Sequence, residues 1–125
     1  MARLLLDTNI LIDHLRGDPT ATTLLRDVET GRVHANISVI TETELLSSAS
    51  LARRELRDIH TLLSFLPTVA VTSRIARTAA ALRRTYHMDL PDALIAATAH
   101  VAHATLVTRN LKHFRQIKGL RVETL

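Results

Sequence analysis

An acidic side chain closes the first apolar run of the chain. Asp7 directly follows Leu4, Leu5 and Leu6. A short apolar run that ends in polar residues is typical of a strand buried on both faces of a parallel sheet. Ligands of open α/β sheets bind at the carboxyl ends of the strands, so Asp7 is a candidate site residue. An Asp in this position also serves as the N-cap of the following helix, and both interpretations stand at this point.

Three further segments place polar side chains at a helix start or after a strand: residues 41–44, 89–92 and 108–110. Thr41 and Glu44 have the spacing of a capping box. Asp89 and Asp92 can cap a helix that carries Pro in its first turn, and Asn110 is a suitable N-cap. Taken one at a time, each segment therefore fits a structural role as well as a chemical one.

Asp92 is the acid that a purely structural role explains least well. Ile95, Ala96 and Ala99 share its helical face, and the opposite face is apolar too. Such a helix is buried nearly all round, and a carboxylate on it requires a partner or a cation. The choice between Glu42 and Glu44 is left open, because neither lies on a face that periodicity identifies as functional.

Convergence of Asp7, one of these glutamates and Asp92 would require a cation or a proton. At a separation of about 5 Å and an effective dielectric constant near 20, each pair of like charges costs about 3 kcal/mol. Three such pairs approach the stability of a small domain, roughly 5–15 kcal/mol. Hard oxygen ligands favour Mg²⁺ or Mn²⁺. A divalent ion would also let an acidic cleft accept a phosphate and orient a water.

Strand and helix patterns alternate along the chain. Apolar runs predict strands at residues 4–6, 33–37, 69–71, 105–107 and 120–122. Amphipathic periods with turn signals predict helices at residues 8–15, 19–30, 38–48, 51–65, 73–86 and 90–103 and a short one near 111. This order predicts an α/β fold with three layers, in which helices flank a central, mostly parallel sheet of four to five strands.

Composition limits the class of protein. The 125 residues predict a single domain spanning 1–125, and the absence of Cys excludes disulfides and thiolate metal sites. The longest apolar stretch, residues 93–104, is too short to cross a bilayer, so we expect a soluble, cytoplasmic protein without a membrane partner. Arg supplies 14 of the 16 Lys and Arg residues in a chain of net charge +4. This surplus favours a nucleic-acid or acidic partner, unless it reflects a general Arg and Ala bias of the genome.

Four blocks of sequence together resemble the PIN-domain ribonucleases, and most closely the VapC toxins of prokaryotic toxin–antitoxin systems. The blocks are residues 5–13 (LLDTNILID), 38–41 (SVIT) with Glu44 and Leu45, 90–99 (LPDALIAATA), and 106–110 (LVTRN) with Phe114. They occur in order between about Leu4 and Val122.

The resemblance implies an endoribonuclease that depends on Mg²⁺ or Mn²⁺. It implies that Asp7, Glu44 and Asp92 hold the metal, and it aligns the family's glutamate with Glu44. It also implies an RNA substrate, commonly tRNA, a small antitoxin that covers the acidic cleft, and a homodimer. Polar family positions around the site correspond to Thr8, Asn9 and Thr108.

The chain departs from the family at its fourth acid. Family members often carry Asp where this chain has Asn110 or His113, so a second metal is in doubt. Asn110 stays a candidate catalytic residue because its amide can hydrogen-bond a water or a carboxylate. Asp89 could supply a supporting charge or cap the helix.

Other functions are compatible with parts of the sequence. The missing fourth acid allows a PIN-like module that binds RNA or protein without cutting. Receiver domains and aspartyl phosphatases also place Asp after a strand. A receiver domain requires an acidic pair after its first strand, which this chain lacks. An aspartyl phosphatase requires a second Asp two residues after the first, where this chain has Asn9. Zinc binding by His100 and His103 lacks further nearby ligands.

Overall fold

The computed structural model describes residues 3–47 and 52–125. Five strands form one sheet in the order β3–β2–β1–β4–β5, and every neighbouring pair is parallel. The strands are β1 (Arg3–Leu6), β2 (His34–Ser38), β3 (Thr68–Val69), β4 (Thr105–Val107) and β5 (Val122–Glu123). The predicted parallel sheet is therefore confirmed.

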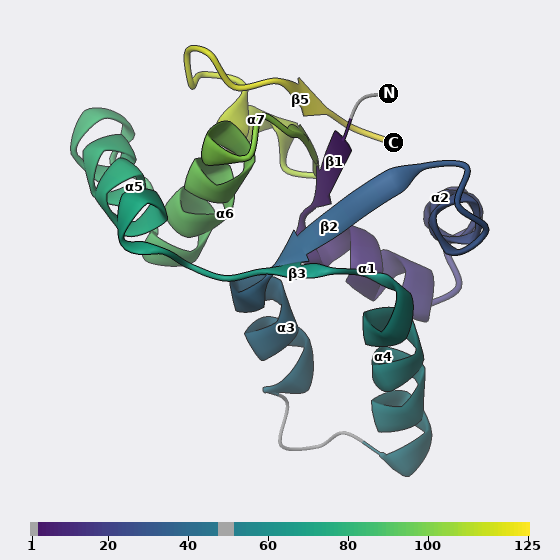
Figure 1. The fold of residues 1–125 in the computed structure, drawn as a ribbon. Helices are drawn as coiled ribbons and strands as arrows, with labels where there is room; N and C mark the ends of the chain where they lie inside the picture. Colours follow the sequence, from purple (N-terminus) through teal and green to yellow (C-terminus); the bar gives the residue numbers. More distant parts are fainter. Residues whose placement is uncertain (1–2, 48–51) are drawn as a thin grey trace.

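Seven helices occur in the described residues. They are α1 (Thr8–Leu15), α2 (Pro19–Glu29), α3 (Val39–Leu46), α4 (Arg53–Phe65), α5 (Ser73–Tyr86), α6 (Leu90–Val101) and α7 (Leu111–Phe114). Figure 1 shows α5 and α6 on one side of the sheet and α1, α2 and α4 on the other. Within these ranges no helix has the length and apolar character needed to cross a membrane.

Each face of the sheet has its own apolar core. Leu5 and Leu106 pack with residues of α5, α6 and α7, including the fully buried Phe114. Leu6 and Val107 pack with residues of α1, α2, α3 and α4. Successive side chains of a strand point to opposite faces, which explains why adjacent leucines contribute to different cores. This arrangement is the predicted three-layer α/β architecture.

Several predicted boundaries are shifted. The last strand is Val122–Glu123 and not residues 120–122, because the chain turns after α7 before Val122 pairs with Leu106. The third strand is Thr68–Val69 and not residues 69–71. The helix expected to reach residue 103 ends at Val101, since His103 has a positive φ of 53°. The predicted helix boundaries at Ser48 and Leu51 lie outside the described residues.

The sheet order places three strand ends side by side. β1 lies between β2 and β4 and runs parallel to both. Asp7 follows β1, α3 follows β2 directly, and Thr108 follows β4. Asp7, the start of α3 and Thr108 therefore lie at the same edge of the sheet, whereas residues 89–92 lie at the start of α6.

Candidate active site

Asp7 links the end of β1 to the start of α1. Its backbone is extended, and its Oδ1 accepts a hydrogen bond of 2.8 Å from the backbone N–H of Thr8, so Asp7 is the N-cap of α1. The residue is only 5% exposed. The capping interpretation is thus confirmed, but burial of the carboxylate has an energetic cost that capping alone does not explain.

The second oxygen of Asp7 is held by neutral side chains. Oδ2 accepts hydrogen bonds from Thr108 Oγ1 at 2.7 Å and from Asn9 Nδ2 at 3.2 Å. Asn9 is itself oriented, because its Oδ1 accepts a hydrogen bond from the backbone N–H of Arg109. The Thr108 hydroxyl also accepts a hydrogen bond from the backbone N–H of Asn110 at 2.9 Å. These contacts fix the carboxylate, and within residues 3–47 and 52–125 no cationic side chain pairs with it.

Glu44 is connected to this cluster through Thr8. The Thr8 hydroxyl donates to Glu44 Oε1 at 2.6 Å and lies 3.0 Å from Thr41 Oγ1. A carboxylate only accepts hydrogen bonds, so the single hydroxyl proton of Thr8 faces Glu44 and Thr41 donates to Thr8. Among the two glutamates left open by periodicity, Glu44 is the one that contacts the Asp7 region.

Helix α3, which carries Glu44, begins after a serine cap. Ser38 is the N-cap, and its side chain accepts a hydrogen bond from the backbone N–H of Ile40. The capping-box interpretation of Thr41 and Glu44 is therefore wrong. Thr41 lies inside the helix and is fully buried against Thr8, which sequence reasoning did not detect.

Asp92 lies in the first turn of α6. The helix is buried nearly all round, as its composition predicted, and the Asp92 side chain is 28% exposed. His113 Nδ1 lies 3.4 Å from Asp92 Oδ2. Asp89 precedes α6 with the extended backbone of an N-cap, and Asn110 precedes α7. Neither side chain makes a capping hydrogen bond.

The pKa of Asp7 reflects its neighbours. Burial raises the pKa of the Asp7 carboxyl above the ordinary value of 3.8. The hydrogen bonds from Thr108 and from the Thr8 backbone oppose this rise, whereas the negative charges of Asp92 and Glu44 add to it. Asp7 is thus within electrostatic range of both other acids, although the three come from distant parts of the sequence.

The donor atoms suit a hydrated divalent ion better than a closed metal cage. In residues 3–47 and 52–125, no three His, Asp or Glu side chains stand close enough to enclose an ion. Thr8 uses Oε1 of Glu44 and His113 uses Oδ2 of Asp92, which leaves the second oxygen of each carboxylate for other contacts. Mg²⁺ keeps several waters and commonly binds through one or two carboxylates, so these residues fit such an ion.

Comparison with known proteins identifies the family of the chain. The sequence matches the PIN domain over residues 4–120. The chain belongs to the PIN-domain family. The relatives include the ribonuclease VapC19 of Mycobacterium tuberculosis, which is 37% identical over 94% of this chain and 96% of its own length. The ribonuclease VapC10 of the same species is 35% identical over 94% of this chain and 90% of its own length. The resemblance inferred from the sequence blocks is confirmed.

Solved PIN-domain structures share the whole fold. A toxin–antitoxin complex from Klebsiella pneumoniae has a TM-score of 0.80 and 36% identity, covering 97% of this chain and 96% of that one. VapBC2 of Rickettsia felis, bound to a promoter DNA fragment, has a TM-score of 0.86 and 25% identity, with 98% of both chains covered. The fold therefore spans essentially the same length in this chain and in these proteins.

Proposed function

We propose that the protein is an Mg²⁺- or Mn²⁺-dependent endoribonuclease of the VapC type. The observation that carries this proposal is the buried Asp7 carboxylate. Among the described residues its hydrogen-bond donors are all neutral, and it lies within electrostatic range of Asp92 and Glu44. A buried charge with two acidic neighbours is stable when a cation joins them. The curated relatives are named ribonucleases and match nearly the full chain, which supports the same reaction here.

Asp7, Asp92 and Glu44 would hold the divalent ion. When bound, the ion would neutralise the acidic edge and supply Lewis acidity toward the scissile phosphodiester of RNA. Thr108 and the Thr8 backbone N–H keep the Asp7 carboxylate in one orientation, and the Thr8 hydroxyl does the same for Glu44. Asn110 is anchored through its backbone, so its amide would contact the substrate or a water.

An antitoxin is the proposed protein partner. A cavity of about 450 Å³ lies between α1, α3 and α4, and Glu44 forms part of its wall. Ile12, Leu15 and Ile59 give it an apolar surface, with Arg16 beside them. A segment of an antitoxin packed there would lie next to the acidic edge, which fits the toxin–antitoxin complexes among the structural relatives. A homodimer and a tRNA or other structured RNA substrate complete the proposal.

A module that binds without cutting is the second candidate. The observation in its favour is that Asn110 and His113 replace the acids often found there, and that no three ligands enclose an ion in the described residues. Under this alternative, RNA would bind and no fragments would form.

The proposal is tested by cleavage of a mixed RNA pool. Three proteins are compared: the wild type, Asp92→Asn and Asp27→Asn. Asp27 lies on α2, away from the site, and is the matched control for the loss of one carboxylate. We expect the wild type and Asp27→Asn to cut in Mn²⁺ and to stop in EDTA, whereas Asp92→Asn loses most of its cleavage rate because a proposed ligand of the ion loses its charge. RNA binding without cleavage by the wild type would favour the binding module instead.

A further inference from the structure

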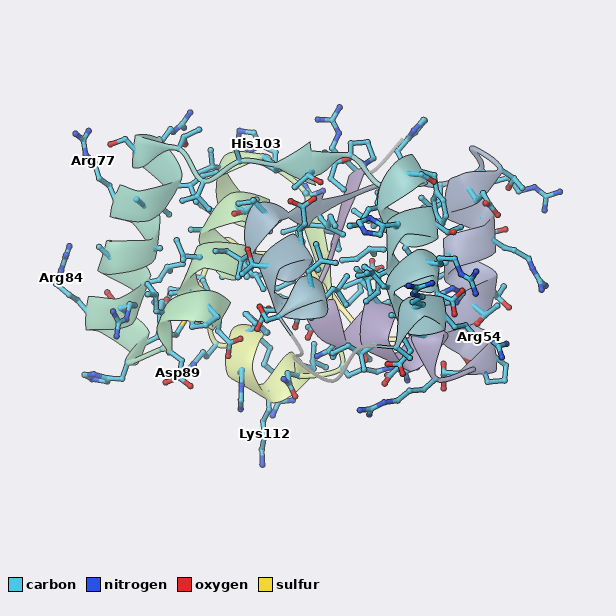
Figure 2. The ribbon with its side chains drawn as sticks, turned by 90° about the horizontal axis from the view of Figure 1, so that it is seen from below. Arg54, Arg77, Arg84, Asp89, His103 and Lys112 are labelled. Atoms are coloured by element: carbon cyan, nitrogen blue, oxygen red, sulfur yellow. The ribbon has the colours of Figure 1, made fainter. Side chains whose placement is uncertain are left out.

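A cavity separate from the one lined by Glu44 lies beside Asp92. It has a volume of about 260 Å³ and is formed by the connection between α5 and α6 together with α7. Its lining includes His87, Asp89, Asp92, Lys112, His113 and Gln116. Figure 2 shows Asp89 at the start of α6 and Lys112 at the same edge of the molecule, with Lys112 extended into solvent. Asp92 lines this cavity and is also a proposed metal ligand, so a molecule in the cavity would touch the proposed active site.

The cavity is formed by a braced segment. His87 ends α5 in the left-handed conformation, and its N–H donates to the carbonyl of Arg83. Arg83 Nε in turn donates to the carbonyl of Met88 at 3.2 Å. The backbone N–H of Lys118 donates to the hydroxyl of Tyr86 at 3.2 Å, which ties the segment after α7 to the end of α5. These hydrogen bonds keep the cavity walls in place before any ligand binds.

The wall offers acceptors and flat rings. Asp89 makes no side-chain capping hydrogen bond to α6, so its oxygens are available to a ligand. The amide nitrogen of Gln116 donates to the carbonyl of His113, which leaves the amide oxygen as an acceptor. The imidazole rings of His87 and His113 lie on the same lining. Unpaired RNA bases are recognised by stacking on such rings and by hydrogen bonds to their edges.

Charge decides between a base and a phosphate as the occupant. Two carboxylates, Asp89 and Asp92, face a single full cation, Lys112, in this lining. The proposed ion would neutralise Asp92, which leaves Asp89 as the charged acceptor in this lining. A phosphate ester has no donor for Asp89, whereas the exocyclic amino group of cytosine, adenine or guanine donates to it. Uracil has no such amino group.

We infer that this cavity receives one unpaired base of the RNA, next to the bond that is cut, and selects bases that carry an exocyclic amino group. The inference rests on the proposed ribonuclease function and names a specificity determinant for it. Asp89 is the selecting acceptor, and His87 supplies a stacking surface.

Two pairs of variants separate recognition from folding. His87 and His103 are both non-glycine residues with positive φ, 56° and 53°, and only His87 lines this cavity. Glycine suits that backbone, so His87→Gly and His103→Gly should both fold. Figure 2 shows His103 at the opposite edge from Lys112, which makes it a distant control. Asp89→Asn is paired with Asp27→Asn on α2.

The test measures steady-state cleavage of short single-stranded RNAs whose nucleotides beside the cut are varied through all four bases. We expect His87→Gly to raise KM severalfold with little change in kcat, and His103→Gly to match the wild type. Asp89→Asn should lower the preference for amino-bearing bases over uracil about fivefold, because a charge-assisted hydrogen bond becomes a neutral one. Asp27→Asn should keep the wild-type preference.

Unchanged KM in His87→Gly together with unchanged base preference in Asp89→Asn would overturn the inference and leave the ribonuclease function intact. A rise in KM that His103→Gly shares equally would overturn it as well, because the effect would then come from the backbone. If the wild-type protein cuts none of these RNAs or a mixed RNA pool, the proposed function and this inference both fail.

Discussion

Asp7 and the pair Asp13 and Asp18 are close in sequence but have opposite surroundings. Arg109 lies 3.1 Å from Asp13 and 2.8 Å from Asp18, and these three side chains are each about one-third exposed, at 31%, 33% and 35%. Asp7 is buried, and its hydrogen-bond donors in the described part of the chain are all neutral. The difference separates two acids that pair with Arg109 from one that pairs with no cation among the residues that the structure describes. We expect Asp13 and Asp18 to have a structural role and Asp7 to bind a divalent ion from solution.

The largest effect is expected from removing the charge of Asp7. Asp7→Asn should lower RNA cleavage in Mn²⁺ by about 1,000-fold or more, because the most buried proposed ligand loses its negative charge. Asp18→Asn is the control from the other kind of acid and should cut RNA at the wild-type rate. Initial rates on one RNA substrate compare the two. If Asp7→Asn cut RNA at the wild-type rate, Asp7 would not be a metal ligand and would not differ in function from Asp18.

The next effect concerns the hydroxyl that holds Asp7. Thr108→Val should lower cleavage by about 10–100-fold, since Asp7 loses its shortest side-chain hydrogen bond and its orientation. This hydrogen bond also lowers the pKa of Asp7, so its loss should move the acidic limb of the pH–rate profile to higher pH. Thr108→Ser keeps the hydroxyl and should restore both rate and profile. A Thr108→Val profile that coincides with the wild type would show that Thr108 only packs.

The raised pKa of Asp7 predicts a dependence of stability on pH. Below the ordinary pKa of 3.8 the carboxyl is protonated in both folded and unfolded states, so burial of its charge costs nothing. As pH rises through the higher folded pKa, the folded state loses stability relative to the unfolded state. In EDTA, Asp7→Asn should therefore gain unfolding free energy relative to wild type between acidic and neutral pH. Urea unfolding over that range measures the difference, and a gap that narrows toward neutral pH would contradict the assigned shift.

The smallest effect is expected from the Arg109 pairs. Asp18→Asn should lower the free energy of unfolding by less than about 1 kcal/mol, because ion pairs that solvent reaches contribute little. Asn also preserves the N-cap of α2, where Asp18 accepts a hydrogen bond from the backbone N–H of Ala21. Urea unfolding at neutral pH measures this value. A loss of several kcal/mol would mean that the Arg109 ion pairs are a major source of stability, contrary to this expectation.

The sheet and most helices could be predicted because their signals are local. Apolar runs mark β1 and β4, and the composition of α6 indicates burial on nearly all sides. The ends of elements were less predictable, since pairing decides them. β5 begins at Val122 because that residue pairs with Leu106, a partner that no local pattern reveals.

The candidate site was predictable in its members but not in its connections. Asp7 and Asp92 stood out from their positions beside a strand and on an apolar helix. The choice of Glu44 over Glu42 depended on family resemblance, because periodicity was ambiguous. The contact of Thr8 with both Thr41 and Glu44 joins α1 to α3 across more than thirty residues, with separations of 33 and 36. Only the packing of these two helices establishes it.

A crystal structure determined after soaking with Mn²⁺ tests the central claim most directly. The account predicts an anomalous peak between the carboxylates of Asp7 and Asp92, with Glu44 bound to the ion directly or through a water, and no such peak in Asp7→Asn. Wild-type crystals in which Mn²⁺ binds elsewhere, or binds equally after Asp7→Asn, would contradict it.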